Sequence, residues 1–155
     1  MNTKQFRELI VRPTLTGIDM HSPAAENLLM GTAAQESHFE YIKQLGDGPA
    51  LGFFQMEPAT HDDIWDNYLE YREELGKATL IECGLSIRPP ADRLMWDMRY
   101  ATAMCRMHYR RVSEPLPDAT DIEGMAAYWK KYYNTAYGAG TKAEFIKNYQ
   151  KFGLG

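Results

Sequence analysis

Apolar residues recur three and four positions apart in several segments of the chain, which is the spacing of a helix face. The first of these segments, residues 3–11, predicts a short helix that ends before Pro13, because the residue before a proline disfavours the helical conformation. Four later segments show the same spacing, and we expect helices over residues 58–74, 91–112, 122–133 and 142–152. The longest of them, 91–112, is expected to be the central core helix.

A further helix, beginning near residue 22, carries the most informative pattern. Ser22 is a preferred N-cap residue, and Pro23 suits the first helical position. One stripe of this helix consists of Ala24, Ala25, Leu28, Leu29, Thr32 and Ala33. Glu36 is the next member of that stripe, since positions three, four and seven apart share a face. A carboxyl group at the end of an apolar stripe loses solvation, so the pKa of Glu36 is predicted to be raised.

A run of turn-forming residues follows this helix closely. The turn residues between positions 44 and 52 are Gly46, Asp47, Gly48, Pro49 and Gly52. Their density predicts a Gly-rich irregular loop or a small β-hairpin. The predicted fold is therefore mostly α, with this loop next to the helix that carries Glu36.

Length and composition fit one globular domain, and we expect residues 1–155 to form it. Hydrophobic residues make up 45% of the chain and charged residues 25%, the balance of an ordinary folded protein. The formal net charge of −4 gives no broad attraction to nucleic acid, so no nucleic-acid partner is expected. Residues 1–12 lack a signal-peptide pattern and no apolar run could span a bilayer. We expect synthesis in the cytoplasm without an export signal, and no membrane partner.

Neither the cysteines nor the histidines predict a metal or cofactor site. Cys83 and Cys105 stand far apart in no metal-binding spacing and are expected to be reduced structural thiols. No histidine pair has the spacing of a zinc motif, so the histidines are expected to face solvent or cap helices. We therefore expect no metal and no cofactor.

Several short segments, in a fixed order, carry a family resemblance. They are Gln35-Glu36-Ser37-His38, Gly46-Asp47-Gly48, Leu51-Gly52-Phe53-Phe54-Gln55-Met56 and Pro58-Ala59-Thr60. Together they resemble the catalytic core of the soluble lytic transglycosylases and goose-type lysozymes of the lysozyme superfamily. The resemblance implies a lysozyme-like domain in which Glu36 is the catalytic acid and Ser37 its neighbour. It also implies that Gly52 and Gln55 belong to a segment lining the sugar cleft.

A later segment, Tyr132-Tyr133-Asn134, resembles the Ala-Tyr-Asn-Ala-Gly signature of lytic transglycosylases, although residues 135–137 depart from it. The resemblance implies that Tyr133 helps to hold the catalytic glutamate and that Asn134 faces the sugar. Aromatic residues can stack on sugar faces, and the candidates are Phe53, Phe54 and Tyr137. Of these we favour Phe53, although a buried position is the commoner outcome for any single aromatic residue.

The second step of the reaction separates two mechanisms. Goose-type lysozymes are hydrolases with additional acidic residues that position water, and the resemblance places Asp47 and Glu57 there. Lytic transglycosylases need no second carboxylate, because a hydroxyl of the muramyl sugar attacks and closes a 1,6-anhydro ring. Asp47 is equally well explained as a turn residue, and Glu57 as an acidic residue at a helix N-terminus.

The expected function is cleavage of the β-1,4 bond between N-acetylmuramic acid and N-acetylglucosamine in peptidoglycan, by a phage-encoded enzyme. The expected partners are glycan strands and, in a phage particle, other virion proteins. One alternative is a virion structural or assembly protein that keeps the lysozyme-like fold without catalysis, since a fold does not guarantee its chemistry. A second alternative is a helical interaction module with no glycan ligand.

Overall fold

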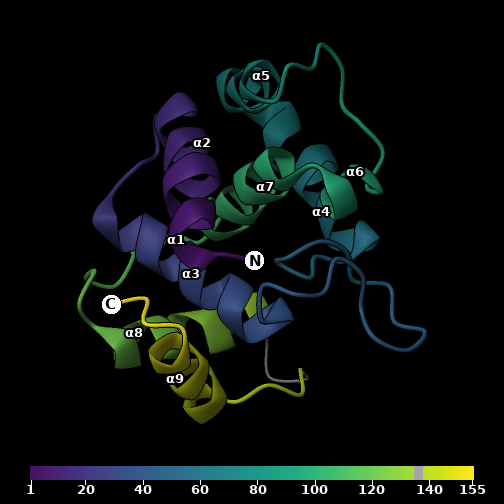
Figure 1. Ribbon diagram of the computed structural model, residues 1–155. Coiled ribbons are helices and arrows are strands. Elements are labelled where there is room, and N and C mark those ends of the chain that lie inside the picture. The colour runs from purple at the N-terminus through teal and green to yellow at the C-terminus, as the bar shows by residue number, and fades with distance from the viewer. Residues whose placement is uncertain (135–137) are drawn as a thin grey trace.

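The computed structural model describes residues 1–134 and 138–155 and consists mainly of helices (Figure 1). The α-helices are α1 (Thr3–Phe6), α2 (Arg12–Gly17), α3 (Pro23–Ser37), α4 (Pro58–Asn67), α5 (Glu73–Glu82), α6 (Arg93–Trp96), α7 (Met98–Arg110), α8 (Ile122–Trp129) and α9 (Lys142–Lys151). Wider π-helical turns, Arg7–Val11 and Lys130–Asn134, continue α1 and α8, and a 3-10 turn, Leu69–Tyr71, follows α4. The prediction of a mostly helical fold is confirmed.

Helix α3 lies in the middle of the molecule, in contact with α7 on one side and with α8 and α9 on another (Figure 1). It is buried on nearly all sides, as expected of a helix inside a core. The predicted apolar stripe therefore covers only part of its buried surface. Gly31, outside that stripe, packs against α9, where an added Cβ would lie 2.5 Å from the ring of Phe145.

Helix α7 is the second central element, which confirms the prediction of a core helix in this part of the chain. It contacts α2, α4, α5 and α6 as well as α3. Its buried residues are Tyr100, Ala101, Thr102, Ala103, Met104, Cys105, Met107 and Tyr109. A buried hydrogen bond of 2.8 Å joins the hydroxyl groups of Tyr109 and Thr32, and so links α7 to α3.

Polar groups inside the core also join α4 to α7. Trp65 Nε1 donates a hydrogen bond of 2.8 Å to the hydroxyl of Tyr100, which lies 2.7 Å from His61 Nε2. His61 Nδ1 lies 2.9 Å from the carboxylate of Asp62 and therefore carries the ring hydrogen, so Nε2 accepts from the Tyr100 hydroxyl. His61 is fully buried, contrary to the expectation that the histidines face solvent or cap helices. Burial lowers the pKa of His61, so the ring is held neutral.

The buried carboxylate of Glu26 fastens the N-terminal helices to α3. Arg7 and Arg12 each approach it to 2.8 Å, and His21 Nε2 approaches it to 2.7 Å. Burial alone would raise the pKa of Glu26, but hydrogen bonds from Arg12, Arg7 and His21 offset that effect and lower it to about 2. This network fixes α1 and α2 against the helix that carries Glu36.

The predicted end of the first helix before Pro13 is wrong. The chain continues through a π-helical turn, Arg7–Val11, and re-enters an α-helix with Pro13 in its first turn. Arg12 N donates to Arg7 O across the wider spacing of that turn. Pro13 lacks a backbone N–H and so leaves one carbonyl group of the preceding turn without its helical partner, and the change from π-helical to α-helical spacing falls at this point.

Two further predicted helices are divided in the structure. The helix expected over 58–74 ends at Asn67, and a separate helix, α5, forms beyond the bend. Tyr68 and Leu69 are buried at that bend, so they continue the apolar spacing of the helix although the helix has ended. Periodicity alone does not distinguish a buried bend from a further helical turn. The helix expected over 91–112 is interrupted at Asp97, whose side chain accepts from Tyr100 N and caps α7.

The segment between α3 and α4 is an irregular loop. Isolated antiparallel bridges join Leu51 to Lys43 and to Met56, and the described residues form no β-sheet. Of the two predicted forms, the structure shows the loop. No helix in the described ranges combines the length and the apolar character needed to cross a membrane.

Candidate active site

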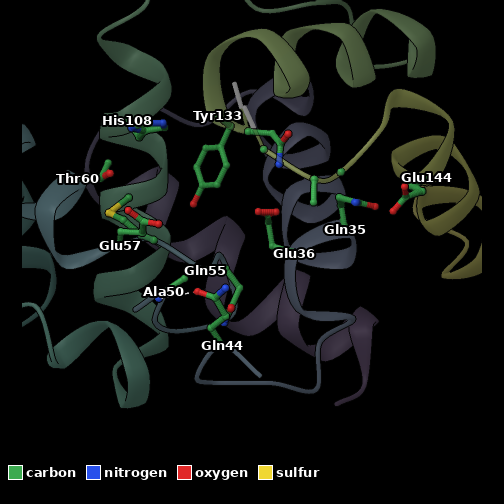
Figure 2. Close-up of a pocket in the computed structure, with 15 residues that line it drawn as sticks. Gln35, Glu36, Gln44, Ala50, Gln55, Glu57, Thr60, His108, Tyr133 and Glu144 are labelled. Atoms are coloured by element: carbon green, nitrogen blue, oxygen red, sulfur yellow. Dashed lines mark hydrogen bonds between the residues drawn. The ribbon is translucent and has the colours of Figure 1, made fainter. Parts of the chain in front are cut away.

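A cleft with a volume of about 560 Å³ lies where the end of α3, the loop before α4 and the turn after α8 meet (Figure 2). Its lining consists of Gln35, Glu36, Gln44, Ala50, Gln55, Met56, Glu57, Thr60, His108, Tyr133, Asn134, Gly138, Ala139, Gly140 and Glu144. Segments from both ends of the chain therefore contribute to one site. Of the predicted site residues, the cleft brings together Glu36, Gln55, Glu57, Tyr133 and Asn134.

Glu36 lies in the last turn of α3, and its carboxyl group points into the cleft (Figure 2). Burial raises its pKa from 4.5 to about 7, and no charged group among the described residues contributes to that shift. The predicted direction of the pKa shift is thus confirmed. Near neutral pH, a substantial fraction of Glu36 is protonated and can donate a proton.

The helix ends at Ser37, one residue after Glu36, which leaves the Glu36 side chain at the cleft wall. His38 caps α3 in the left-handed conformation, with φ of 53°, and Phe39 follows with φ of 54°. Ser37 is fully buried, and its hydroxyl donates to Ala33 O at 3.0 Å. Ser37, expected to contact substrate, is therefore placed behind the cleft wall and not among the lining residues.

Gly52 and Gln55 enclose a tight turn in the loop. Gly52 has φ of +77°, and an added Cβ there would lie 2.2 Å from Leu94 O, so only glycine fits. Gln55 also has positive φ, 49°, and its side-chain Nε2 donates to Gly52 O at 2.8 Å. Gln55 lines the cleft, whereas Gly52 acts through the backbone conformation that places Gln55.

The aromatic residues of this turn face the core. Phe53 and Phe54 are both buried, and the ring of Phe53 packs edge-to-face on Phe6 at 5.5 Å. Neither residue lines the cleft, so the structure gives Phe53 an anchoring role in place of the predicted sugar contact. Tyr137, the other aromatic candidate, lies outside the described residues.

The two acidic candidates of the loop are placed differently. Asp47 is exposed and is not among the lining residues, which fits the alternative of a turn residue. Glu57 is the N-cap residue of α4, and its side chain makes no capping hydrogen bond. Figure 2 shows Glu57 and Glu36 pointing into the cleft from opposite sides. The site therefore contains a buried carboxyl group and, across from it, an exposed one.

Tyr133 also lines the cleft, and its hydroxyl end extends toward the space between these two glutamates (Figure 2). Its hydroxyl donates to Phe54 O at 2.6 Å, and its ring stacks on Tyr109 at 5.3 Å. This residue thus fixes the loop that carries Gln55 and Glu57. Among the described residues, the hydrogen bonds of Tyr133 do not include one to Glu36, so the direct hold that the resemblance implies is not seen.

Asn134 is held by Lys130 at the edge of the cleft. The Lys130 ammonium donates to Asn134 Oδ1 at 2.7 Å, to Gly138 O at 3.0 Å and to Gly140 O at 2.7 Å. All three donors of the ammonium group are thereby used. Because its oxygen is bound to Lys130, Asn134 has its amide N–H groups left for a ligand.

His108 is a lining residue that the sequence did not indicate as functional. Burial lowers its pKa to about 4, so the ring is neutral, and Arg111 Nη2 lies 2.9 Å from its Nδ1. Arg111 in turn pairs with Asp63 at 2.7 Å. The ring of His108 meets that of Tyr133 edge-on at 4.7 Å. This chain of contacts supports Tyr133 from behind.

The remaining lining residues with polar side chains, which the sequence did not single out as site residues, are Gln35, Gln44, Thr60 and Glu144. Gln35 and Thr60 could have been found from their places inside the matched segments, whereas no sequence signal points to Glu144. Gln35 Oε1 accepts from Asn148 Nδ2 at 2.7 Å, which ties the end of α3 to α9.

The described residues contain no group of three or more His, Cys, Asp or Glu side chains arranged to hold a metal ion. Comparisons with protein-family models, with curated proteins and with solved structures find no match to this chain. The functional argument therefore depends on the geometry and chemistry of the cleft.

Proposed function

We propose that this protein cleaves the β-1,4 bond between N-acetylmuramic acid and N-acetylglucosamine in peptidoglycan, with Glu36 as the general acid. The observation that supports this most strongly is the position of the Glu36 carboxyl group, which lines the cleft and has a pKa raised by burial to about 7. A glycosidase needs such a group because the departing glycosidic oxygen must receive a proton near neutral pH.

The rest of the lining supports a sugar ligand. Six of the fifteen described lining residues carry an amide or a hydroxyl group; Gln55 and Thr60 can donate and accept hydrogen bonds, and Asn134 can donate them. Sugar hydroxyl and acetamido groups are both donors and acceptors, so such a lining is complementary to them. The choice of peptidoglycan, and of a lysozyme-like domain, is supported by the resemblance of residues 28–60 and 126–134 to the lysozyme superfamily.

Glu57 supports hydrolysis as the second half of the reaction. In the proposed step, Glu36 gives its proton to the glycosidic oxygen as the bond from that oxygen to the anomeric carbon breaks. Water attacks the anomeric carbon from the other side and transfers a proton to Glu57. The products are a new reducing end and a free hydroxyl, and solvent then restores the two protonation states. Asp47 has no role in this scheme, because it lies outside the cleft.

The experiment is mass spectrometry of soluble fragments released from purified peptidoglycan by the wild type, by Glu36→Gln and by Asp47→Asn. We expect fragments from the wild type and from Asp47→Asn, and none from Glu36→Gln. Reducing ends would support hydrolysis, whereas products one water lighter would show the 1,6-anhydro route. Absence of fragments from the folded wild type would contradict the proposal and favour the virion structural protein.

A further inference from the structure

Lys130 is not a lining residue of the cleft, yet its ammonium group joins several residues that are. It begins the π-helical turn that continues α8, and its side chain is half-buried. The ammonium group holds Asn134 on one side of residues 135–137, and Gly138 and Gly140 on the other. All three acceptors are neutral amide oxygens, and all three residues line the cleft. Lys130 therefore ties together the edge of the cleft from behind.

This contact determines which end of the Asn134 amide is available to a ligand. An ammonium group has donors and no acceptor, so Lys130 can hold only the oxygen of the amide. The reverse orientation would place Nδ2, a donor, against another donor. Gly138 covers the same oxygen, since an added Cβ there would lie 2.4 Å from Asn134 Oδ1. The oxygen is thus enclosed, and the N–H groups are the part of the amide left for a ligand.

Close packing around the turn at 138–140 supports a single arrangement of this edge. An added Cβ on Gly140 would lie 2.7 Å from Cη2 of Trp129, which is fully buried. The turn is therefore bounded by the core on one side and by the Lys130 ammonium group on another. Hydrogen bonds from a charged donor are stronger than those between neutral groups, so Lys130 is suited to hold this edge.

We propose that Lys130 is a positioning residue for glycan cleavage, a role that rests on the proposed function. By binding Asn134 Oδ1, it directs the Asn134 N–H groups at an oxygen atom of the bound sugar strand. The group that fits is an acceptor, either the carbonyl oxygen of an acetamido group or a hydroxyl oxygen. Without Lys130, either end of the amide can face the cleft, and one of the two orientations has no donor to offer.

Kinetics with soluble peptidoglycan fragments as the substrate test this role. Lys130→Met removes the ammonium group and keeps an unbranched side chain. We expect KM to rise about fivefold and kcat to change by less than about twofold, because Asn134 binds the strand without taking part in bond cleavage. Lys131→Met is the matched control and should keep the wild-type KM. Lys131 is the next residue, is exposed, and lies 3.5 Å from Glu114 Oε1, outside the cleft.

The variant Asn134→Ala separates an effect through Asn134 from a general one. Removing the amide should itself raise KM by about fivefold or more. Adding Lys130→Met to it should then change KM by less than about twofold, because the amide that Lys130 orients is gone. Increases in KM that multiply in the double variant would overturn the proposal. A wild-type KM in Lys130→Met, or a loss confined to kcat, would also overturn it.

NMR signals of the Asn134 side-chain amide keep this role distinguishable from the proposed function. They should shift in Lys130→Met and not in Lys131→Met, and unchanged signals in both would overturn the proposal. Shifted signals in a protein that releases no glycan fragments would overturn the proposed function and support only the orientation of the amide by Lys130.

A second variant covers the case in which Lys130→Met does not fold. Asn134→Asp keeps an oxygen for the Lys130 ammonium group but has no N–H donor. This variant should fold, and its KM should rise about fivefold, as expected for the loss of one hydrogen bond to the ligand. A folded Asn134→Asp variant with the wild-type KM would overturn the proposal.

Discussion

Replacing Glu36 by glutamine is expected to stabilise the protein at alkaline pH. A pKa raised from 4.5 to about 7 means that the folded state binds the Glu36 proton more tightly than the unfolded chain does. Stability therefore falls as the pH rises from 4.5 to about 7 and stays reduced above that range. The charged carboxylate costs the folded state about 3 kcal/mol at pH 8, and glutamine removes that cost.

The assay is urea denaturation of the wild type and Glu36→Gln at pH 4 and pH 8. At pH 4 the carboxyl group is protonated in both states, so the two proteins should have nearly equal free energies of unfolding. At pH 8 the variant should be more stable by about 3 kcal/mol. Glu57→Gln, which removes an exposed carboxylate from the same cleft, should change the stability by less than about 0.5 kcal/mol at either pH.

A stability difference between wild type and Glu36→Gln that is the same at pH 4 and pH 8 would refute this reasoning, because it would mean that Glu36 is not desolvated. A wild type that is more stable than the variant at pH 8 would indicate a favourable partner for the carboxylate. Either result would also remove the physical basis for a protonated acid in the cleft.

Two further substitutions test the scaffold around the site. Gly52→Ala should destabilise the chain by about 2 kcal/mol or more and reduce fragment release, because the added Cβ would collide with Leu94 O. Urea denaturation measures the first effect and the peptidoglycan assay the second. A variant as stable as the wild type would contradict the close approach of Gly52 to Leu94 O. Tyr100→Phe should lower the free energy of unfolding by about 2 kcal/mol, because His61 and Trp65 lose their shared hydrogen-bond partner. Urea denaturation measures this change, and an unchanged free energy of unfolding would mean that the buried hydroxyl does not stabilise the fold.

The features that could be predicted from the sequence are those that depend on local spacing. Glu36 ends an apolar stripe, and its raised pKa follows from that position. The glycine-rich segment after α3 forms a loop, and Gly52 needs the positive φ that glycine allows. In both cases the local pattern indicated the feature, and contacts with distant segments complete it, because Glu36 is buried in a cleft lined from both ends of the chain and Gly52 lies against Leu94 O.

The features that could not be predicted depend on contacts between distant segments. Phe53 lies in a matched motif, but its contact with Phe6 across the core decides that it is buried. Ser37 is an exception, because its position behind the cleft wall follows from local helix geometry, in which adjacent residues face different directions. His108 and Glu144 reach the cleft only through the packing of α7 and α9.

The central claim is that protonated Glu36 drives glycan cleavage, and the rate of fragment release from purified peptidoglycan as a function of pH tests it most directly. The account predicts that the wild-type rate falls by about tenfold per pH unit above pH 7, as Glu36 loses its proton, and that Glu36→Gln is inactive throughout. A wild-type rate that stays constant from pH 6 to pH 9, or a Glu36→Gln variant that releases the same fragments, would contradict it.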